Sequence, residues 1–305
     1  MYFKYMKIRT TLNINTNNLN TLSRIFTPLV LDSVADNGHS SYLTDVCSNS
    51  LLLNKIDMNF PFSDFLNGVY SVLFKNYRNE YIYKNVIANK ILLGKHSLNT
   101  SQMLTEFRVG KCKADVVVIN GTSTVYEIKS EFDSFARLEK QLSAYRQVFD
   151  HINVITSEKQ AKKLQKELPK EIGILVVTNR NTISTIQKSI SNKQNIIGSV
   201  LFASLRKNEY LSIIKKLNGA IPDAPNTMIF KECKSLFLKA SPETAHDIAM
   251  VELRKRNEAS SITEFLRYAP DSLSAYIISN SNNKSKLQAL ADKYTTSIGT
   301  ILAPA

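Results

Sequence analysis

The chain has 305 residues, 43% of them hydrophobic, which is enough to bury the core of one or two globular domains. It carries 39 basic and 26 acidic residues, and this net charge of +13 favours a polyanionic partner, either nucleic acid or an anionic membrane, between which composition alone does not choose. The scattered cysteines and histidines argue against a disulfide framework and a zinc finger, and the short apolar runs exclude a transmembrane helix. We expect a cytoplasmic protein without a signal peptide or a membrane partner.

The first 60 residues are rich in Asn, Ser and Thr, with short apolar pieces between them. We predict a short helical or irregular N-terminal arm, whose role the sequence does not indicate. Residues 61–93 follow a helical pattern, because Phe62, Phe65, Val69 and Val72 recur at steps of three and four residues.

After Thr100 the pattern changes to that of strands, which are rich in valine and isoleucine. The predicted elements are, in order, strands at 104–109, 114–120 and 124–129, an amphipathic helix at 135–149, a strand at 152–156, a charged helix at 158–168 and a strand at 172–178. This order predicts an α/β fold whose core runs helix, three strands, helix, strand.

From about residue 182 the β pattern fades, and we predict a helical C-terminal extension. Ser241-Pro242-Glu243-Thr244 has the composition of a helix start, with an N-cap serine, a proline and an acid in the first turn. The basic run 254–256 either contacts DNA or complements a helix dipole. The expected organisation is an arm over residues 1–60, an α/β domain over 61–190 and a helical region over 191–305.

Three charged residues interrupt the two most apolar strands: Asp115 in one, and Glu127 and Lys129 in the next. Charged side chains are rarely buried unless they are paired or bind a metal. Glu127 and Lys129 are two residues apart, so on a strand they share a face.

The turn between these strands decides whether Asp115 joins the same face. A three-residue loop at 120–122 places Asp115 opposite Glu127, whereas a two-residue Asn120-Gly121 turn would place it opposite Tyr126. A shared site therefore requires an odd-numbered loop or a bulge.

Two carboxylates, from Asp115 and Glu127, and the backbone carbonyl of Ile128 would form an oxygen site suited to Mg²⁺ or Mn²⁺. Such an ion can activate a water and neutralise charge on a scissile phosphate. Lys129 could orient that water or stabilise the transition state. The alternative is structural: Asp115 begins a strand, and Glu127 and Lys129 form an exposed pair on an edge strand.

An acid-ended strand followed by Glu-x-Lys resembles the PD-(D/E)xK nuclease superfamily, with Ala114 where the motif has proline. Gln141 and Tyr145 on the next helix resemble the Gln-x-x-x-Tyr element of its RecB-like branch. The resemblance covers residues 68–180. It implies a restriction-endonuclease-like core in which Gln141 and Tyr145 flank the metal site. It also implies an acidic residue on the preceding helix, with Glu80 as the best positional match and Glu106 as the runner-up.

The stretch 77–156 also resembles a small family of uncharacterised bacterial RecB-like proteins associated with phage defence or mobile elements. We therefore expect a magnesium-dependent nuclease that hydrolyses phosphodiester bonds in DNA, with RNA as the less favoured substrate. Arg108, Lys111 and Lys113 would grip phosphates beside the site, or else form a solvated loop. Two other functions stay open: a non-catalytic nucleic-acid-binding module and a protein-interaction subunit. The sequence does not indicate the oligomeric state.

Overall fold

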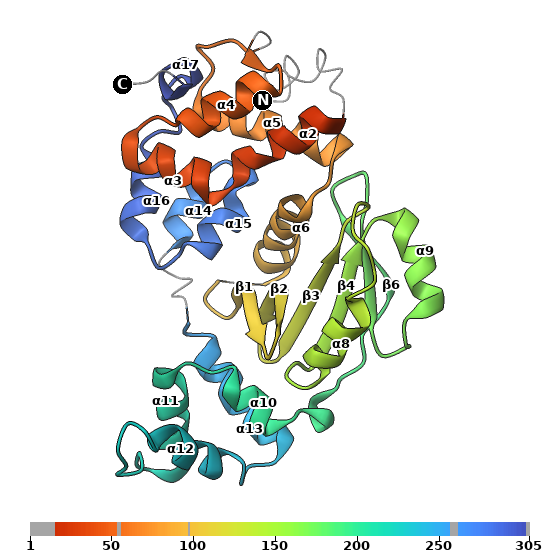
Figure 1. The fold of residues 1–305 in the computed structure, drawn as a ribbon, viewed down its shortest axis with the longest axis vertical. Helices are drawn as coiled ribbons and strands as arrows, with labels where there is room; N and C mark the ends of the chain where they lie inside the picture. Colours follow the sequence, from red (N-terminus) through yellow and green to blue (C-terminus); the bar gives the residue numbers. More distant parts are fainter. Residues whose placement is uncertain (1–15, 54–55, 97, 257–261, 303–305) are drawn as a thin grey trace. The chain divides into compact units, whose positions relative to one another are not determined.

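The computed structural model describes residues 16–53, 56–96, 98–256 and 262–302, which form two compact units (Figure 1). Unit 1 combines Met1–Ile91 with Glu258–Ala305, and unit 2 comprises Leu92–Asn257. None of the helices in the described ranges combines the length and apolarity that a bilayer crossing requires.

Unit 1 is helical. Its elements are α2 (Thr16–Ser23), η1 (Arg24–Phe26), α3 (Pro28–Asn37), α4 (Ser41–Asn49), α5 (Phe62–Asn76), α6 (Glu80–Ile87), α14 (Thr263–Tyr268), η6 (Asp271–Leu273), α15 (Ser274–Ser279), α16 (Lys284–Ala291) and α17 (Ile298–Leu302). The π-helical turn η3 (Ala88–Leu92) crosses from unit 1 into unit 2.

The C-terminal helices of unit 1 pack on its N-terminal helices. Helix α16 contacts α3, and the Thr44 hydroxyl donates to the carbonyl oxygen of Leu302 at 2.7 Å. The Asn85 side-chain amide donates to the carbonyl oxygen of Asp271 at 2.8 Å. The units therefore differ from the division at residues 60 and 190 expected from the sequence, because contacts between the two ends of the chain define unit 1.

Unit 2 is built on a six-stranded mixed sheet in the order β1-β2-β3-β4-β5-β6. Strands β1 to β3 form an antiparallel meander, β3, β4 and β5 are parallel, and β6 is antiparallel to β5. The strands are β1 (Gln102–Val109), β2 (Cys112–Ile119), β3 (Ser123–Lys129), β4 (His151–Thr156), β5 (Gly173–Val177) and β6 (Ile183–Gln187). The helices are α7 (Leu93–Lys95), α8 (Leu138–Arg146), α9 (Glu158–Glu167), η4 (Lys193–Asn195), α10 (Gly198–Ala203), α11 (Lys207–Asn218), α12 (Ile229–Phe237) and α13 (Pro242–Leu253).

The five strands predicted from the sequence are confirmed, but the sixth strand was missed. Strand β6 is an edge strand whose middle residues, Ser184 to Ile186, are exposed. It therefore carries little of the apolar signal that marks a buried strand. A short turn connects it to β5, in which Asn181 has a left-handed φ of 57° and the Thr178 N–H donates to the Thr182 carbonyl oxygen.

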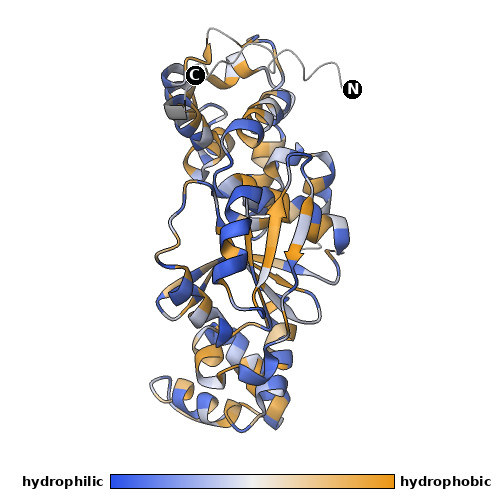
Figure 2. Ribbon diagram, turned by 90° about the vertical axis from the view of Figure 1, so that its right-hand side faces the viewer, coloured by the Kyte–Doolittle hydropathy of each residue, from blue (hydrophilic) through white to orange (hydrophobic). Residues whose placement is uncertain are grey.

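The parallel connections bring α8 and α9 against the sheet, as expected for crossovers between parallel strands. Leu142 of α8 and Leu164 of α9 join the same buried cluster as Val125, Val154 and Ile174 of the strands. Figure 2 shows the central strands coloured mainly as hydrophobic and the helices as alternating stretches.

The chain is helical after residue 190, as predicted, and helices α10 to α13 extend this cluster and contribute to the core of unit 2. The predicted start of α13 is confirmed, because the Ser241 side chain accepts a hydrogen bond from the Thr244 N–H.

Asp150 holds the start of β4 to two other segments. Its carboxylate accepts hydrogen bonds at 2.5 Å from the Thr122 and Ser191 hydroxyls and at 3.0 Å from the Asn192 N–H. Burial raises the pKa of the Asp150 carboxyl, but the combined lowering effect of these hydrogen bonds is larger. The pKa of Asp150 therefore lies below its usual value.

We predict that Asp150→Asn lowers the free energy of unfolding by about 2 kcal/mol at pH 7, because an amide cannot replace these charge-assisted bonds. The pKa of Asp150 is lower in the folded protein than in the unfolded chain. The contribution of Asp150 is therefore present above the unfolded pKa of about 3.9 and is lost as the pH falls through the folded pKa. Urea unfolding at pH 7 and at pH 3 should show the two proteins converging in acid, whereas a constant gap would contradict this account.

Candidate functional site

The turn between β2 and β3 sets the geometry of the candidate site. Strand β2 ends at Ile119 and β3 begins at Ser123, so the loop has three residues, with Gly121 at a left-handed φ of 69°. Val116 pairs with Tyr126, and one step further along the same register Asp115 stands opposite Glu127. The odd-numbered loop required by the sequence analysis is confirmed.

Glu127 and Lys129 form a buried ion pair on β3. Their side chains are 1% and 8% exposed, and the Lys129 Nζ lies 2.6 Å from the Glu127 Oε1. Lys129 also donates to the Gln141 Oε1 at 3.0 Å. The Tyr145 hydroxyl lies 2.8 Å from both the Glu127 Oε2 and the Lys113 carbonyl oxygen. Four predicted site residues, Glu127, Lys129, Gln141 and Tyr145, therefore form one hydrogen-bonded network. The structural alternative, an exposed pair of Glu127 and Lys129 on an edge strand, is wrong, because both side chains are buried.

The Tyr145 hydroxyl is held in its protonated form. Burial and the neighbouring Glu127 carboxylate raise the pKa of Tyr145 well above its usual value, because both disfavour a phenolate. The protonated hydroxyl therefore donates to the carboxylate and fixes the orientation of Glu127.

Asp115 is tied to the same strand through the backbone. Its Oδ2 accepts a hydrogen bond of 2.7 Å from the Ile128 N–H. The paired ladder between β2 and β3 ends at Val116 and Tyr126, so the Asp115 carboxylate takes over a backbone donor beyond that point. Ile128, whose carbonyl oxygen is the predicted third ligand, is thus hydrogen-bonded to Asp115 through its own N–H.

Glu106 extends the acidic row to a third strand. It stands between the pairs Thr105–Val116 and Phe107–Ala114, so its register position is opposite Asp115. Its φ of 54° is left-handed, a conformation that costs a non-glycine residue about 1–2 kcal/mol. Carboxylate oxygens of Glu106 and Asp115 lie within 4.8 Å of each other. The row Glu106, Asp115 and Glu127 therefore crosses β1, β2 and β3.

The predicted role of Glu80 at the site stays a prediction, and Arg108, Lys111 and Lys113 lie on or beside the β1–β2 turn. Glu80 belongs to unit 1, where it begins α6 and pairs with Lys84 at 2.6 Å. Arg108 and Lys111 are exposed on the β1–β2 hairpin, and Lys113 pairs with Glu106 at 2.9 Å. Within unit 2, Glu106 is thus the acidic residue that accompanies Asp115.

Two residues of the basic run near the end of α13 make ion pairs within unit 2. Arg256 pairs with Glu209 at 2.7 Å through two of its nitrogens, and its guanidinium lies 5.0 Å from the centre of the Phe107 ring. Lys255 pairs with the buried Glu252 at 2.8 Å. The Arg256–Glu209 pair ties the end of α13 to α11, while Arg254 and Lys255 are exposed, so the expected DNA contact of this run stays a prediction.

Comparison with known proteins identifies a family. The family model described as bacteriophage P4 protein cII matches residues 74–292, which include strands β1 to β6 and the site residues Asp115, Glu127, Lys129, Gln141 and Tyr145. The chain belongs to the bacteriophage P4 cII family.

Two individual proteins are similar to parts of this cII-family chain. Protein cII of Enterobacteria phage P4 is 27% identical over 104 residues, which are 34% of this chain and 37% of that protein. The chain therefore matches little more than a third of the length of this curated relative. A solved protein of unknown function from Silicibacter pomeroyi matches 30% of this chain and 62% of its own, with 19% identity and a TM-score of 0.26.

One constellation in the cII-family protein was not anticipated from the sequence. The Ser123 Oγ lies 2.8 Å from the His246 Nε2, and the His246 Nδ1 lies 2.9 Å from the Asp247 Oδ1. This order resembles a nucleophilic triad, but Ser123 and His246 are fully buried, and Ser123 also accepts the Asp150 N–H at 3.0 Å. Burial also lowers the pKa of His246, against the smaller raising effect of Asp247. The group therefore joins α13 to the sheet and is closed to a substrate.

We predict strong coupling between the two members of the buried ion pair. Lys129→Met should lower the free energy of unfolding by about 3–5 kcal/mol, because it leaves the Glu127 carboxylate buried without a counter-ion. The double variant Glu127→Gln, Lys129→Met should regain most of that loss, since it contains no buried charge at this place. Denaturant unfolding of the wild type, both single variants and the double variant measures the coupling. Additive losses would show that the two side chains do not stabilise each other.

Proposed function

We propose that this cII-family protein is a metal-dependent nuclease that hydrolyses phosphodiester bonds in DNA, with RNA as the second choice. The observation that carries the proposal is the register that places Asp115 opposite Glu127 on neighbouring strands, with Lys129 paired to Glu127 and with Gln141 and Tyr145 of α8 bonded to Lys129 and Glu127. The antiparallel meander, the crossover helix α8 and the parallel strand β4 support a restriction-endonuclease-like core.

Two residues of the acidic row, Glu106 and Asp115, together with the Ile128 carbonyl, offer ligands that fit Mg²⁺ or Mn²⁺. Glu106 and Asp115 offer carboxylate oxygens within 4.8 Å of each other, and Ile128 offers a carbonyl, all hard ligands of the kind that these ions prefer. Glu106 is exposed and Asp115 half-buried, so a hydrated ion can reach them. An ion held there would lower the pKa of a bound water and neutralise charge on the scissile phosphate.

The protein residues supply orientation and charge beside that position. Lys129 has three ammonium hydrogens, two of which are donated to Glu127 and Gln141. The third hydrogen is available to a water or a phosphate oxygen. Because Glu127 and Gln141 fix the ammonium group, its positive charge would need no reorganisation to act on the charge that develops in the proposed reaction.

The charge of the whole chain supports nucleic acid as the substrate, since a net charge of +13 attracts a phosphate backbone. The family is described by a bacteriophage P4 protein, and this supports a role in a mobile element or in phage defence.

A second candidate is a non-catalytic nucleic-acid-binding module on the same fold. It is favoured by Glu127, whose two oxygens already contact Lys129 and Tyr145 within the protein. Calorimetry distinguishes the two: salt-sensitive DNA binding without Mg²⁺ binding would establish the module and refute the nuclease.

We predict that the purified protein cuts DNA in Mg²⁺ and not in EDTA. Asp115→Asn and Lys129→Met should each reduce the cleavage rate at least 100-fold, because each removes a charge that acts on the transition state. Asp223→Asn is the matched control, since Asp223 is exposed on the segment between α11 and α12 and should leave the rate unchanged. Wild-type rates in both site variants would refute the assignment.

Glu106 should act on the metal. We predict that Glu106→Gln raises the Mg²⁺ concentration needed for half-maximal cleavage by roughly 10–100-fold, because one anionic ligand is lost. The control is Glu139→Gln, which makes the same change at an exposed position of α8. An unchanged Mg²⁺ requirement in Glu106→Gln would exclude Glu106 from the metal site.

A further inference from the structure

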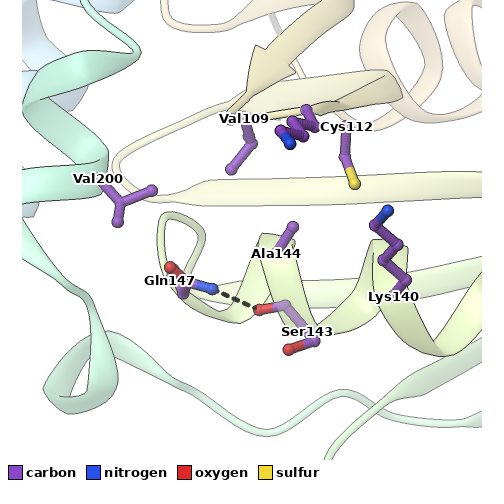
Figure 3. Close-up of a pocket in the computed structure, with 9 residues that line it drawn as sticks. Val109, Cys112, Lys140, Ser143, Ala144, Gln147 and Val200 are labelled. Atoms are coloured by element: carbon purple, nitrogen blue, oxygen red, sulfur yellow. Dashed lines mark hydrogen bonds between the residues drawn. The ribbon is translucent and has the colours of Figure 1, made fainter.

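A hollow of about 300 Å³ lies between the β1–β2 hairpin turn and α8 (Figure 3). Gly110 and Lys111 form the turn, with Gly110 at a left-handed φ of 56°, as a two-residue hairpin loop requires at its first position. Helix α8 forms the opposite wall, and Val200 of α10 lies at one side. Its volume is at the lower end of the range of small-ligand sites.

The charge of this hollow is positive. Lys111 comes from the turn and Lys140 from the helix, and no acidic side chain lines the space. Neither lysine has an ion-pair partner among the described residues, whereas the nearby Lys113 is paired with Glu106. In Figure 3 the Lys140 amine points from α8 towards Cys112 on the facing strand. Two ammonium groups on facing walls without a counter-ion favour an anionic ligand.

The rest of the wall is apolar. Val109, Ala144 and Val200 line the hollow, and the small side chain of Ala144 leaves space above α8 (Figure 3). A phosphate alone would leave these surfaces in water. A nucleotide matches both features, because it joins an anionic phosphate to a sugar and a flat base that pack on apolar groups.

The hollow adjoins the candidate site, because residues that line the hollow and residues that contact Glu127 and Lys129 follow one another along α8. Lys140 and Ala144 line the hollow, and Gln141 and Tyr145, one residue further along, contact Lys129 and Glu127. A strand whose phosphate lies beside Lys129 can therefore place a neighbouring nucleotide against Lys140.

We propose that this hollow, the α8 pocket, binds one unpaired nucleotide of the substrate, with its phosphate between Lys111 and Lys140 and its base against Val109, Ala144 and Val200. A base inside a duplex is stacked and cannot enter, so the pocket selects single-stranded nucleic acid. This inference rests on the proposed function for its substrate, but the binding itself requires no metal.

The test is binding of a fluorescein-labelled ten-nucleotide oligothymidylate to the full chain in EDTA, followed by fluorescence anisotropy. Ala144→Leu fills the pocket without changing charge and should raise the Kd about tenfold, while binding of a blunt duplex stays unchanged. Lys111→Ala with Lys140→Ala should raise the Kd at least tenfold. The control is Lys159→Ala with Lys170→Ala, which removes the same charge from exposed positions elsewhere in unit 2 and should have a much smaller effect.

Alkylation of Cys112 gives a second readout in the unaltered protein. Cys112 lines the pocket and is partly exposed, whereas Cys47 and Cys233 are buried. The single strand should slow alkylation of Cys112 by iodoacetamide, and the duplex should not.

A wild-type Kd for the single strand in Ala144→Leu, or a Cys112 alkylation rate that the single strand does not change, would refute nucleotide binding in the α8 pocket. Cleavage that is insensitive to Asp115→Asn would instead overturn the nuclease site, so the two failures are distinguishable. The Kd values of an RNA and a DNA oligonucleotide of the same sequence show which of the two nucleic acids the pocket prefers.

Discussion

The three-residue turn between β2 and β3 is the constraint on which the candidate site depends. Side chains alternate along a strand, so one residue fewer in this turn would place Asp115 on the face away from Glu127. The turn is closed by the Asn120 N–H, which donates to the Thr122 carbonyl oxygen at 2.9 Å, and the Thr122 hydroxyl donates to Asp150 at 2.5 Å. Asp150 thus supports the register of the acidic row, although it makes no direct contact with it.

Much of unit 2 could be predicted from the sequence because its strands are dense in valine and isoleucine and are separated by polar turns. The same density made Asp115, Glu127 and Lys129 conspicuous, since charges inside such strands need a partner. The shared face of Gln141 and Tyr145 followed from their helical spacing. These are local signals, and each concerns residues that are close together in the chain or in adjacent strands.

The remaining features depend on contacts that no local pattern encodes. Strand β6 is stabilised by pairing with β5 and not by burial, so its composition resembles that of a loop. In the sequence, Arg256 belongs to a basic run of the kind that contacts DNA. In the folded protein its guanidinium instead pairs with Glu209 and lies over the Phe107 ring, both of which come from distant segments. The left-handed backbone of Glu106 is likewise a product of the folded sheet, because a glutamate in a strand sequence gives no indication of it.

The buried pair of Glu127 and Lys129 argues for function more strongly than for stability. Taking two charges out of water costs several kcal/mol each, and apolar side chains of similar volume would often serve the fold at least as well. Here the cost is offset by hydrogen bonds from Tyr145 to Glu127 and from Lys129 to Gln141. Both partners come from one turn of α8, so a single helix fixes the ammonium group, and the acidic row beside it stays open to solvent at Glu106. A buried and fixed cation on the strand next to the acidic row is what the proposed nuclease would use to stabilise a phosphate in its transition state, whereas apolar side chains would serve a purely structural strand.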